Sequence, residues 1–222
     1  MLQQITVIGV PIDLGADRRG VDMGPSAIRY ANLKDKLQRI GYEVEDIGNL
    51  AVPTPESYSV GDTKLKYLRE IVSVNEHLAQ TVSDVIGQGR FPLVLGGDHS
   101  IAIGTIAGVT SQQKRTGVIW FDAHGDLNTA HTSPSGNIHG MPLAASLGLG
   151  HPELTGCGGR GNKILPHNVV IIGARSLDEG EKNVIREHGI HVFTMHEIDR
   201  MGMAKVIEES LNIVSDGTDG VH

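Results

Sequence analysis

The stretch Asp122-Ala123-His124-Gly125-Asp126 combines two carboxylates and one imidazole within five positions. It follows an apolar run, residues 116–121, of the kind that forms a strand buried on both faces. If the backbone stays extended beyond this run, side chains at alternate positions share one side, and Asp122, His124 and Asp126 converge. Converging carboxylates repel each other and lose hydration, and a divalent cation offsets both costs. The stretch therefore predicts a metal site.

A second apolar run, residues 91–95, leads into Gly96-Gly97-Asp98-His99-Ser100. Open α/β sheets bind ligands at the carboxyl ends of neighbouring parallel strands, so we expect His99 to join Asp122, His124 and Asp126. The alternative for a lone histidine, a hydrogen-bonded or surface residue, stays open for His99. Oxygen and nitrogen ligands suit Mn²⁺, Zn²⁺ or Fe²⁺, and the carboxylates favour Mn²⁺. Two ions bridged by Asp122 would activate water but would need more carboxylates than these, so part of the ligand set is expected to be missing.

Strand-like apolar runs alternate with helical patterns along the chain. This alternation predicts an α/β fold with a mainly parallel sheet flanked by helices, in one domain spanning residues 1–222. We expect strands at 5–11, 44–47, 91–95, 116–121, 168–173 and 191–193, and helices at 25–40, 63–88, 101–113, 139–148, 178–188 and 204–214. Residues 127–138 form a polar loop where binding loops usually lie. Gly156, Gly158 and Gly161 match a dinucleotide-binding spacing, but the strand and helix which that motif requires are not expected beside them.

The composition limits the classes of function. A net charge of −7 and the absence of a Lys/Arg cluster argue against a nucleic-acid surface. One cysteine, Cys157, excludes an internal disulfide and a thiolate-rich zinc site. No apolar run approaches the roughly 20 residues of a membrane span, and residues 1–4 lack the basic region of a signal peptide. A cytoplasmic protein acting on a small molecule, with no nucleic-acid or membrane partner, is therefore expected.

Several stretches resemble the arginase family of manganese-dependent ureohydrolases, and the resemblance covers essentially the whole chain. The stretches are 96–100, 122–128 (Asp-Ala-His-Gly-Asp-Leu-Asn), 135–142 (Ser-Gly-Asn-Ile-His-Gly-Met-Pro) and the N-terminal loop 19–25. The resemblance implies a three-layer α/β/α fold, a binuclear Mn²⁺ centre and a homotrimer or hexamer. It also implies hydrolysis of the guanidinium group of L-arginine to L-ornithine and urea by a metal-bridged hydroxide.

The same resemblance implies a role for individual residues. His99, Asp122 and Asp126 would hold one metal, and Asp122 and His124 the other. Asp126 would also pass a proton to the leaving amine, and His139 would act as proton shuttle. The implied substrate contacts are Asn128, Ser135 and Asn137 to the α-carboxylate, and Asp178, with Glu181 behind it, to the α-amino group. Helix capping is the alternative for Asp178 and Glu181, and turn formation for Asn128 and Ser135.

One departure from the arginases concerns the end of the printed sequence, Gly220-Val221-His222. Arginases have a strand there that leads into a Ser-x-Asp-x-Asp-x-x-Asp-Pro motif with further metal carboxylates, followed by a glutamate that binds the guanidinium. Asp216 and Asp219 do not have that spacing. We therefore expect this chain by itself to bind metal weakly and to hydrolyse arginine poorly or not at all.

Four alternatives remain at this stage. An agmatinase-like ureohydrolase would not need the residues that recognise a carboxylate. A metallophosphoesterase needs a Gly-Asn-His step, which Gly136-Asn137-Ile138-His139 does not provide. A serine hydrolase at Ser100 lacks the nucleophile elbow. A non-catalytic member of an oligomer would bind fewer than two metal ions per chain.

Overall fold

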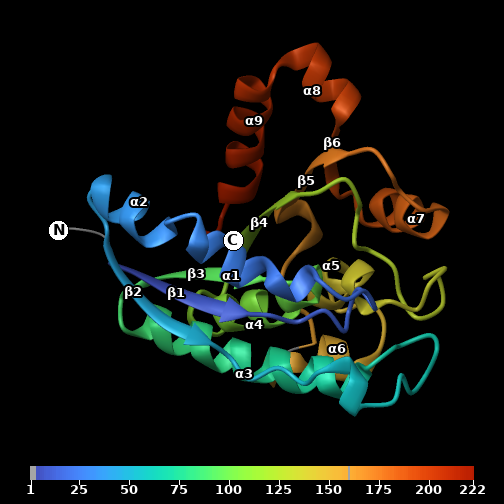
Figure 1. Ribbon diagram of the computed structural model, residues 1–222. Helices are drawn as coiled ribbons and strands as arrows, with labels where there is room; N and C mark the ends of the chain where they lie inside the picture. The colour runs from blue at the N-terminus through green and yellow to red at the C-terminus, as the bar shows by residue number, and fades with distance from the viewer. Residues whose placement is uncertain (1–3, 160) are drawn as a thin grey trace.

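The computed structural model describes residues 4–159 and 161–222, in which seven strands form two sheets covered by helices (Figure 1). The first sheet has the order β2-β1-β3, with β1 at Gln4–Val10, β2 at Glu43–Asn49 and β3 at Phe91–Gly96. The second has the order β6-β5-β4-β7, with β4 at Thr116–Phe121, β5 at Val169–Ala174, β6 at His191–Thr194 and β7 at Gly220–Val221. Every strand pair is parallel. The parallel arrangement predicted from the alternating pattern is confirmed.

The helices connect these strands. They are α1 (Gly24–Tyr30), α2 (Leu33–Arg39), α3 (Leu68–Gly87), α4 (Ala102–Gln112), α5 (Pro142–Ser146), α6 (Pro152–Thr155), α7 (Glu179–His188), α8 (Met195–Met201) and α9 (Met203–Ser215). Short 3₁₀ turns lie at 21–23, 55–57, 99–101, 138–140, 157–159 and 166–168. Within the described residues, none of the helices combines the length and apolar character needed to cross a membrane.

Both sheets are buried between two helical layers because alternate side chains of a strand face opposite sides. In β1, Ile8 and Val10 pack with α3, whereas Ile5 and Val7 pack against Leu33 of α2 and its neighbours. In β5, the 169 and 171 side chains pack with α4 and α7, and the 170 and 172 side chains pack with α8 and α9. This packing is the three-layer α/β/α arrangement.

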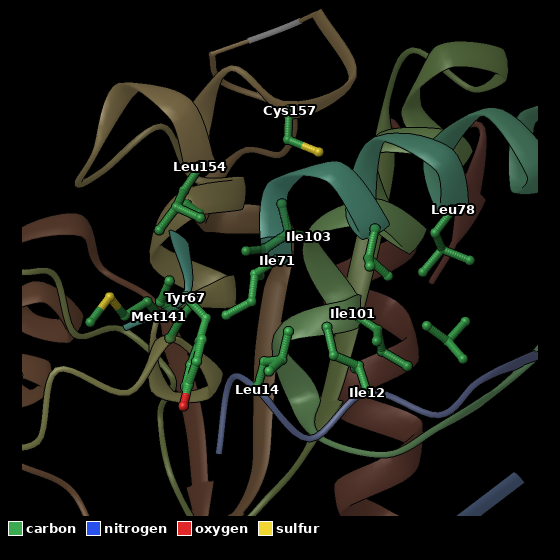
Figure 2. Packing of buried hydrophobic residues seen from close by; sticks show 14 of the residues in the cluster. Ile12, Leu14, Tyr67, Ile71, Leu78, Ile101, Ile103, Met141, Leu154 and Cys157 are labelled. Carbon is green, nitrogen blue, oxygen red and sulfur yellow. The ribbon is translucent and has the colours of Figure 1, made fainter. Parts of the chain in front are cut away.

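Helix α4 packs against both sheets. Ile103 belongs to the core of the first sheet, and Ile106 to the core of the second. Figure 2 shows the first core, where Ile12 and Leu14 of the loop after β1 lie near Ile101, the last residue of the 3₁₀ turn before α4. Apolar packing thus fixes the two loops that leave the carboxyl ends of β1 and β3.

A cavity of about 710 Å³ lies between the edges of β3 and β7. Its lining is mostly apolar and includes Leu93 and Val94 of β3, Val109 of α4 and Val221 of β7, with His99 also on its wall. Among the described residues, β3 pairs only with β1, and β7 pairs only with β4. Each strand therefore has a second edge without a strand partner in the described chain.

Several local details differ from the sequence expectations, among them the helix expected at 139–148, which covers only α5 (Pro142–Ser146). The helix expected at 25–40 is split into α1 and α2 because Asn32 adopts a left-handed conformation (φ 61°). The helix expected from residue 63 begins only at Leu68, after Tyr67 with φ 54°. Helix α8 was not expected. The segment 156–159 has the short α6 before it instead of a strand, so it does not form a dinucleotide-binding turn.

Candidate metal centre

The carboxyl ends of β3 and β4 bring three candidate ligands together. His99 Nδ1 lies 3.1 Å from Asp122 Oδ2 and 2.8 Å from Asp126 Oδ2. One ligand atom from each residue lies within 4.8 Å of the other two. His99 is in the turn after β3, whereas both aspartates are in the loop after β4. Although β3 and β4 belong to different sheets, their carboxyl ends lie close enough to bring the three residues together.

Asp122 lies between two imidazoles. Its Oδ2 faces His99, and its Oδ1 lies 3.2 Å from His124 Nδ1. His124 is more exposed, with 59% of its side chain accessible, and it lies outside the cluster of three. Asp122 is thus the residue of this group whose two oxygens each face a different imidazole.

The backbone of residues 122–126 forms a turn and does not continue as an extended strand. The His124 N–H donates to Asp122 Oδ1 at 2.9 Å, which closes a side-chain turn, and Asp126 has a left-handed backbone (φ 51°). The expectation that an extended chain aligns Asp122, His124 and Asp126 was therefore wrong in its mechanism. A backbone amide competes for the Asp122 side chain, as is common for aspartates that follow a strand.

The electrostatics of the cluster suit a cation. Burial alone would lower the pKa of His99, but its interactions with the Asp122 and Asp126 carboxylates outweigh burial and raise that pKa to about 9. For Asp122, burial acts to raise the pKa, but bonds from His99 and the His124 backbone lower it overall. Without a metal ion, the protonated His99 imidazole therefore supplies the positive charge that balances the Asp122 and Asp126 carboxylates.

The residues present also fit a metal ion. Asp126 Oδ2 is buried and accepts no well-aligned hydrogen bond from the described residues, although His99 Nδ1 is close. Buried carboxylate oxygens are otherwise almost always bonded. His99 is itself held by stacking on Trp120, with the ring centroids 4.3 Å apart. An oxygen-rich set with one imidazole and no sulfur is a donor set for a hard or intermediate divalent ion.

Comparison with known proteins places this chain in a family. The model of the arginase family matches residues 3–222. The arginase of Bacillus caldovelox is 59% identical over the whole chain, and that of Bacillus subtilis strain 168 is 60% identical. The chain belongs to the arginase family. In each case it spans 74% of the length of the relative.

Solved structures agree with this family assignment. The native structure of the Bacillus caldovelox arginase superposes with a TM-score of 0.96 at 59% identity, covering 100% of this chain and 74% of the other. An arginase from Entamoeba histolytica, solved in complex with L-ornithine, gives a TM-score of 0.91 at 38% identity with the same coverage. The three-layer fold and a hydrolase of the arginase type are thereby established. The reaction of the family converts L-arginine to L-ornithine and urea.

The residues expected to bind substrate fall into two groups. Asn128 Nδ2 donates to Asp178 Oδ2 at 2.9 Å, so these two side chains, 50 positions apart, lie together. Ser135 Oγ accepts the Asn137 N–H at 3.2 Å, and Asn137 Nδ2 donates to the carbonyl of Ala16 at 2.9 Å. The turn expected as an alternative for Ser135 and the helix cap expected for Asp178 are both present, so these residues have structural partners as well.

Glu181 and His139 are positioned differently from each other. Glu181 is 3% exposed, and its two oxygens accept the N–H groups of Leu127 and Asp178. His139 is half-buried, and its backbone N–H donates to the Gly15 carbonyl at 3.1 Å. Glu181 therefore accepts backbone N–H groups from the start of its own helix and from Leu127. Leu127 lies in the loop after β4, residues 122–127, which we call the metal loop.

Asp98 is a residue whose role the sequence did not indicate. It is 6% exposed and accepts the N–H groups of Gly15, Ala16 and Ser100. The loop that it holds supplies the carbonyls bonded by Asn137 and His139. The only sequence signal for Asp98 was its position directly before His99. Adjacent side chains on an extended strand point to opposite sides, so this position predicted that Asp98 points away from the metal site.

Proposed function

We propose that the carboxyl ends of β3 and β4 form part of a site that binds two Mn²⁺ ions and hydrolyses L-arginine. His99, Asp122 and Asp126 would hold one ion, and Asp122 and His124 the other. The observation that carries this proposal is that the two carboxylate oxygens of Asp122 lie 3.1 and 3.2 Å from different imidazoles. The carboxylates in the site favour Mn²⁺ over softer ions.

When bound, the ions would supply an activated water and a positive charge opposite the charge that develops in the transition state. Asp126 would accept a proton and pass it to the leaving amine. His139, on the loop across the site, would exchange protons with solvent. Trp120 and the apolar cores keep His99 in place while this occurs.

The substrate would be recognised at its amino-acid end. The Asn128 and Asn137 amides each donate one Nδ2 hydrogen bond, to Asp178 and to the Ala16 carbonyl, so each keeps a second N–H that can donate to a carboxylate. Asn128, Ser135 and Asn137 would contact the α-carboxylate. The exposed carboxylate of Asp178 suits an α-ammonium group, and Glu181 lies behind it.

The test is urea release from L-arginine after warming with Mn²⁺, with metal analysis of the same sample. We expect L-arginine to be preferred over agmatine, which lacks the carboxylate, and Asn137→Ala to raise KM for arginine more than for agmatine. Equal use of both substrates would contradict the arginase assignment of the site and favour the agmatinase-like alternative. The metal content also tests the expectation that the chain binds metal weakly.

We also propose an assembly and a cellular location. The resemblance of the motifs to the arginases supports a homotrimer or homohexamer, which light scattering after gel filtration would measure. Cys157 is free and buried, as expected of a protein in the reducing cytoplasm. Because α4 contributes to the cores of both sheets, we also propose that residues 1–222 form one domain.

A further inference from the structure

The candidate metal ligand Asp126 has a backbone conformation that L-residues rarely adopt. Its φ is 51°, whereas such left-handed values are usually found at glycine. A strained residue of this kind persists only where its surroundings hold it in place. The contacts that hold it therefore decide where its carboxylate lies.

The peptide group between Asp126 and Leu127 is bonded at both of its polar atoms. Its oxygen, the Asp126 carbonyl, accepts the N–H groups of Leu143 and Ala144 in the first turn of α5, each at 3.1 Å. Its nitrogen, that of Leu127, donates to Glu181 Oε1 at 3.2 Å. Because both atoms are engaged from opposite elements, the plane of this peptide cannot rotate without losing a buried hydrogen bond.

Glu181 is built into this contact. Its side chain is buried, and its other oxygen accepts the Asp178 N–H at 2.9 Å, as part of the capping box that begins α7. Gly125 leaves room for it, since a Cβ at that position would lie 3.1 Å from Glu181 Oε1. A capping glutamate needs only its own helix, so the second bond to the metal loop is not explained by capping.

The chain contains a matched case without that second bond. Helix α8 begins with a capping box formed by Thr194 and Glu197, in which Glu197 Oε2 accepts the Thr194 N–H at 2.7 Å and the hydroxyl at 3.0 Å. Both partners of Glu197 belong to the start of α8. It therefore shares the capping role of Glu181 and lacks the contact with the metal loop.

We propose that Glu181 is a positioning residue for the metal ligand Asp126. It holds the Leu127 amide, and so keeps Asp126 in the left-handed conformation that directs its carboxylate to His99. This assignment rests on the proposed function, because it takes Asp126 as a metal ligand. It gives Glu181 a task distinct from contact with the substrate.

The test compares Mn²⁺ affinity, measured by titration calorimetry, in the wild-type chain and in Glu181→Ala, Glu181→Gln and Glu197→Ala. We expect Glu181→Ala to weaken binding about tenfold or more, as is typical when a residue that orients a ligand is lost. Glu181→Gln keeps one oxygen for the Leu127 amide but turns its NH2 group toward the Asp178 N–H, so it should recover only part of the affinity. Glu197→Ala should bind Mn²⁺ like the wild type, although it also loses a cap.

Two further variants make the outcome decisive. In an Asp126→Ala background, the Glu181→Ala effect on affinity should vanish, because Glu181 acts through Asp126. If Glu181→Ala does not fold, Gly125→Ala, which displaces the same carboxylate, takes its place. Equal Mn²⁺ affinity in wild type and Glu181→Ala would overturn this assignment alone. No Mn²⁺ binding by the wild type would overturn it together with the proposed function.

Discussion

Helices α7 and α8 begin with the same local device, yet only the first reaches the metal loop. In both, an N-cap side chain accepts an amide from the third helical residue, and a glutamate at that residue returns a bond to the cap. Glu181 is fully buried and also bonds Leu127, whereas Glu197 is half-buried and bonds only Thr194. A sequence pattern therefore specifies where a helix begins, while the tertiary contact of the same residue decides whether it also shapes a site.

The largest difference between the metal loop and α8 is expected in Mn²⁺ affinity, when one carboxylate is neutralised in each. Asp126→Asn should weaken Mn²⁺ binding more than about 100-fold, because a lost ligand costs more than a lost supporting contact. Asp199→Asn, an exposed change in α8, should leave the affinity unchanged. Titration calorimetry measures both. Retained Mn²⁺ affinity in Asp126→Asn would remove this residue from the ligand set.

Mn²⁺ should raise the free energy of unfolding through the metal loop and its contact with α7, and not through α8. At a Mn²⁺ concentration of 100 times Kd, the free energy of unfolding should rise by about 2.7 kcal/mol and the Tm by about 5 to 10 °C. At that concentration Glu197→Ala should show the full increment, and a tenfold loss of affinity in Glu181→Ala should remove about 1.4 kcal/mol of it. Differential scanning calorimetry with and without EDTA tests this, and equal increments in the two variants would contradict it.

Without metal, the two capping variants should differ by less. Glu197→Ala should lower the free energy of unfolding by about 1 kcal/mol, the usual effect of a lost cap. Glu181→Ala should cost about 1 to 3 kcal/mol more, since the buried Leu127 amide loses its acceptor. Urea unfolding of the metal-free protein measures both values. A smaller loss for Glu181→Ala than for Glu197→Ala would mean that the Leu127 bond contributes nothing.

The smallest effect concerns pH. In the metal-free protein, the pKa of His99 is raised from 6.5 to about 9. A raised pKa stabilises the fold fully below pH 6.5, and the contribution is lost as pH rises through 9. The side chain is 38% exposed, so solvent screening keeps the effect small. Tm should fall over this range in wild type and Glu197→Ala, and His99→Gln should flatten the fall; a Tm that rises would show the opposite sign.

The sequence was sufficient to predict which strands carry the site. Long apolar runs followed directly by acids and histidines identify β3 and β4 and the residues at their ends. The conformation of the loop after β4 was not predictable in the same way. It depends on the Asp122 side chain, which competes with strand pairing for the His124 backbone amide. It also depends on support for Asp126 from α5 and α7, more than 15 positions away.

The remaining differences have a similar cause. Asn32 and Tyr67 interrupt helical patterns by adopting left-handed conformations, which periodicity does not register. Helix α8 is only seven residues long, too short for a clear amphipathic pattern. The role of Asp98 and the bond from Leu127 to Glu181 were not predictable, because their partners are backbone amides, which leave no trace in the side-chain pattern.

The cavity between β3 and β7 gives His99 a second neighbourhood. Its imidazole lies on the wall of a mostly apolar chamber of about 710 Å³ as well as beside the acids. A polypeptide segment lodged there would restrict the ring and change its readiness to bind a cation. By thermodynamic reciprocity, the cation would change the hold on that segment to the same degree. A segment bound in the cavity and a metal ion at the centre would therefore be coupled through His99.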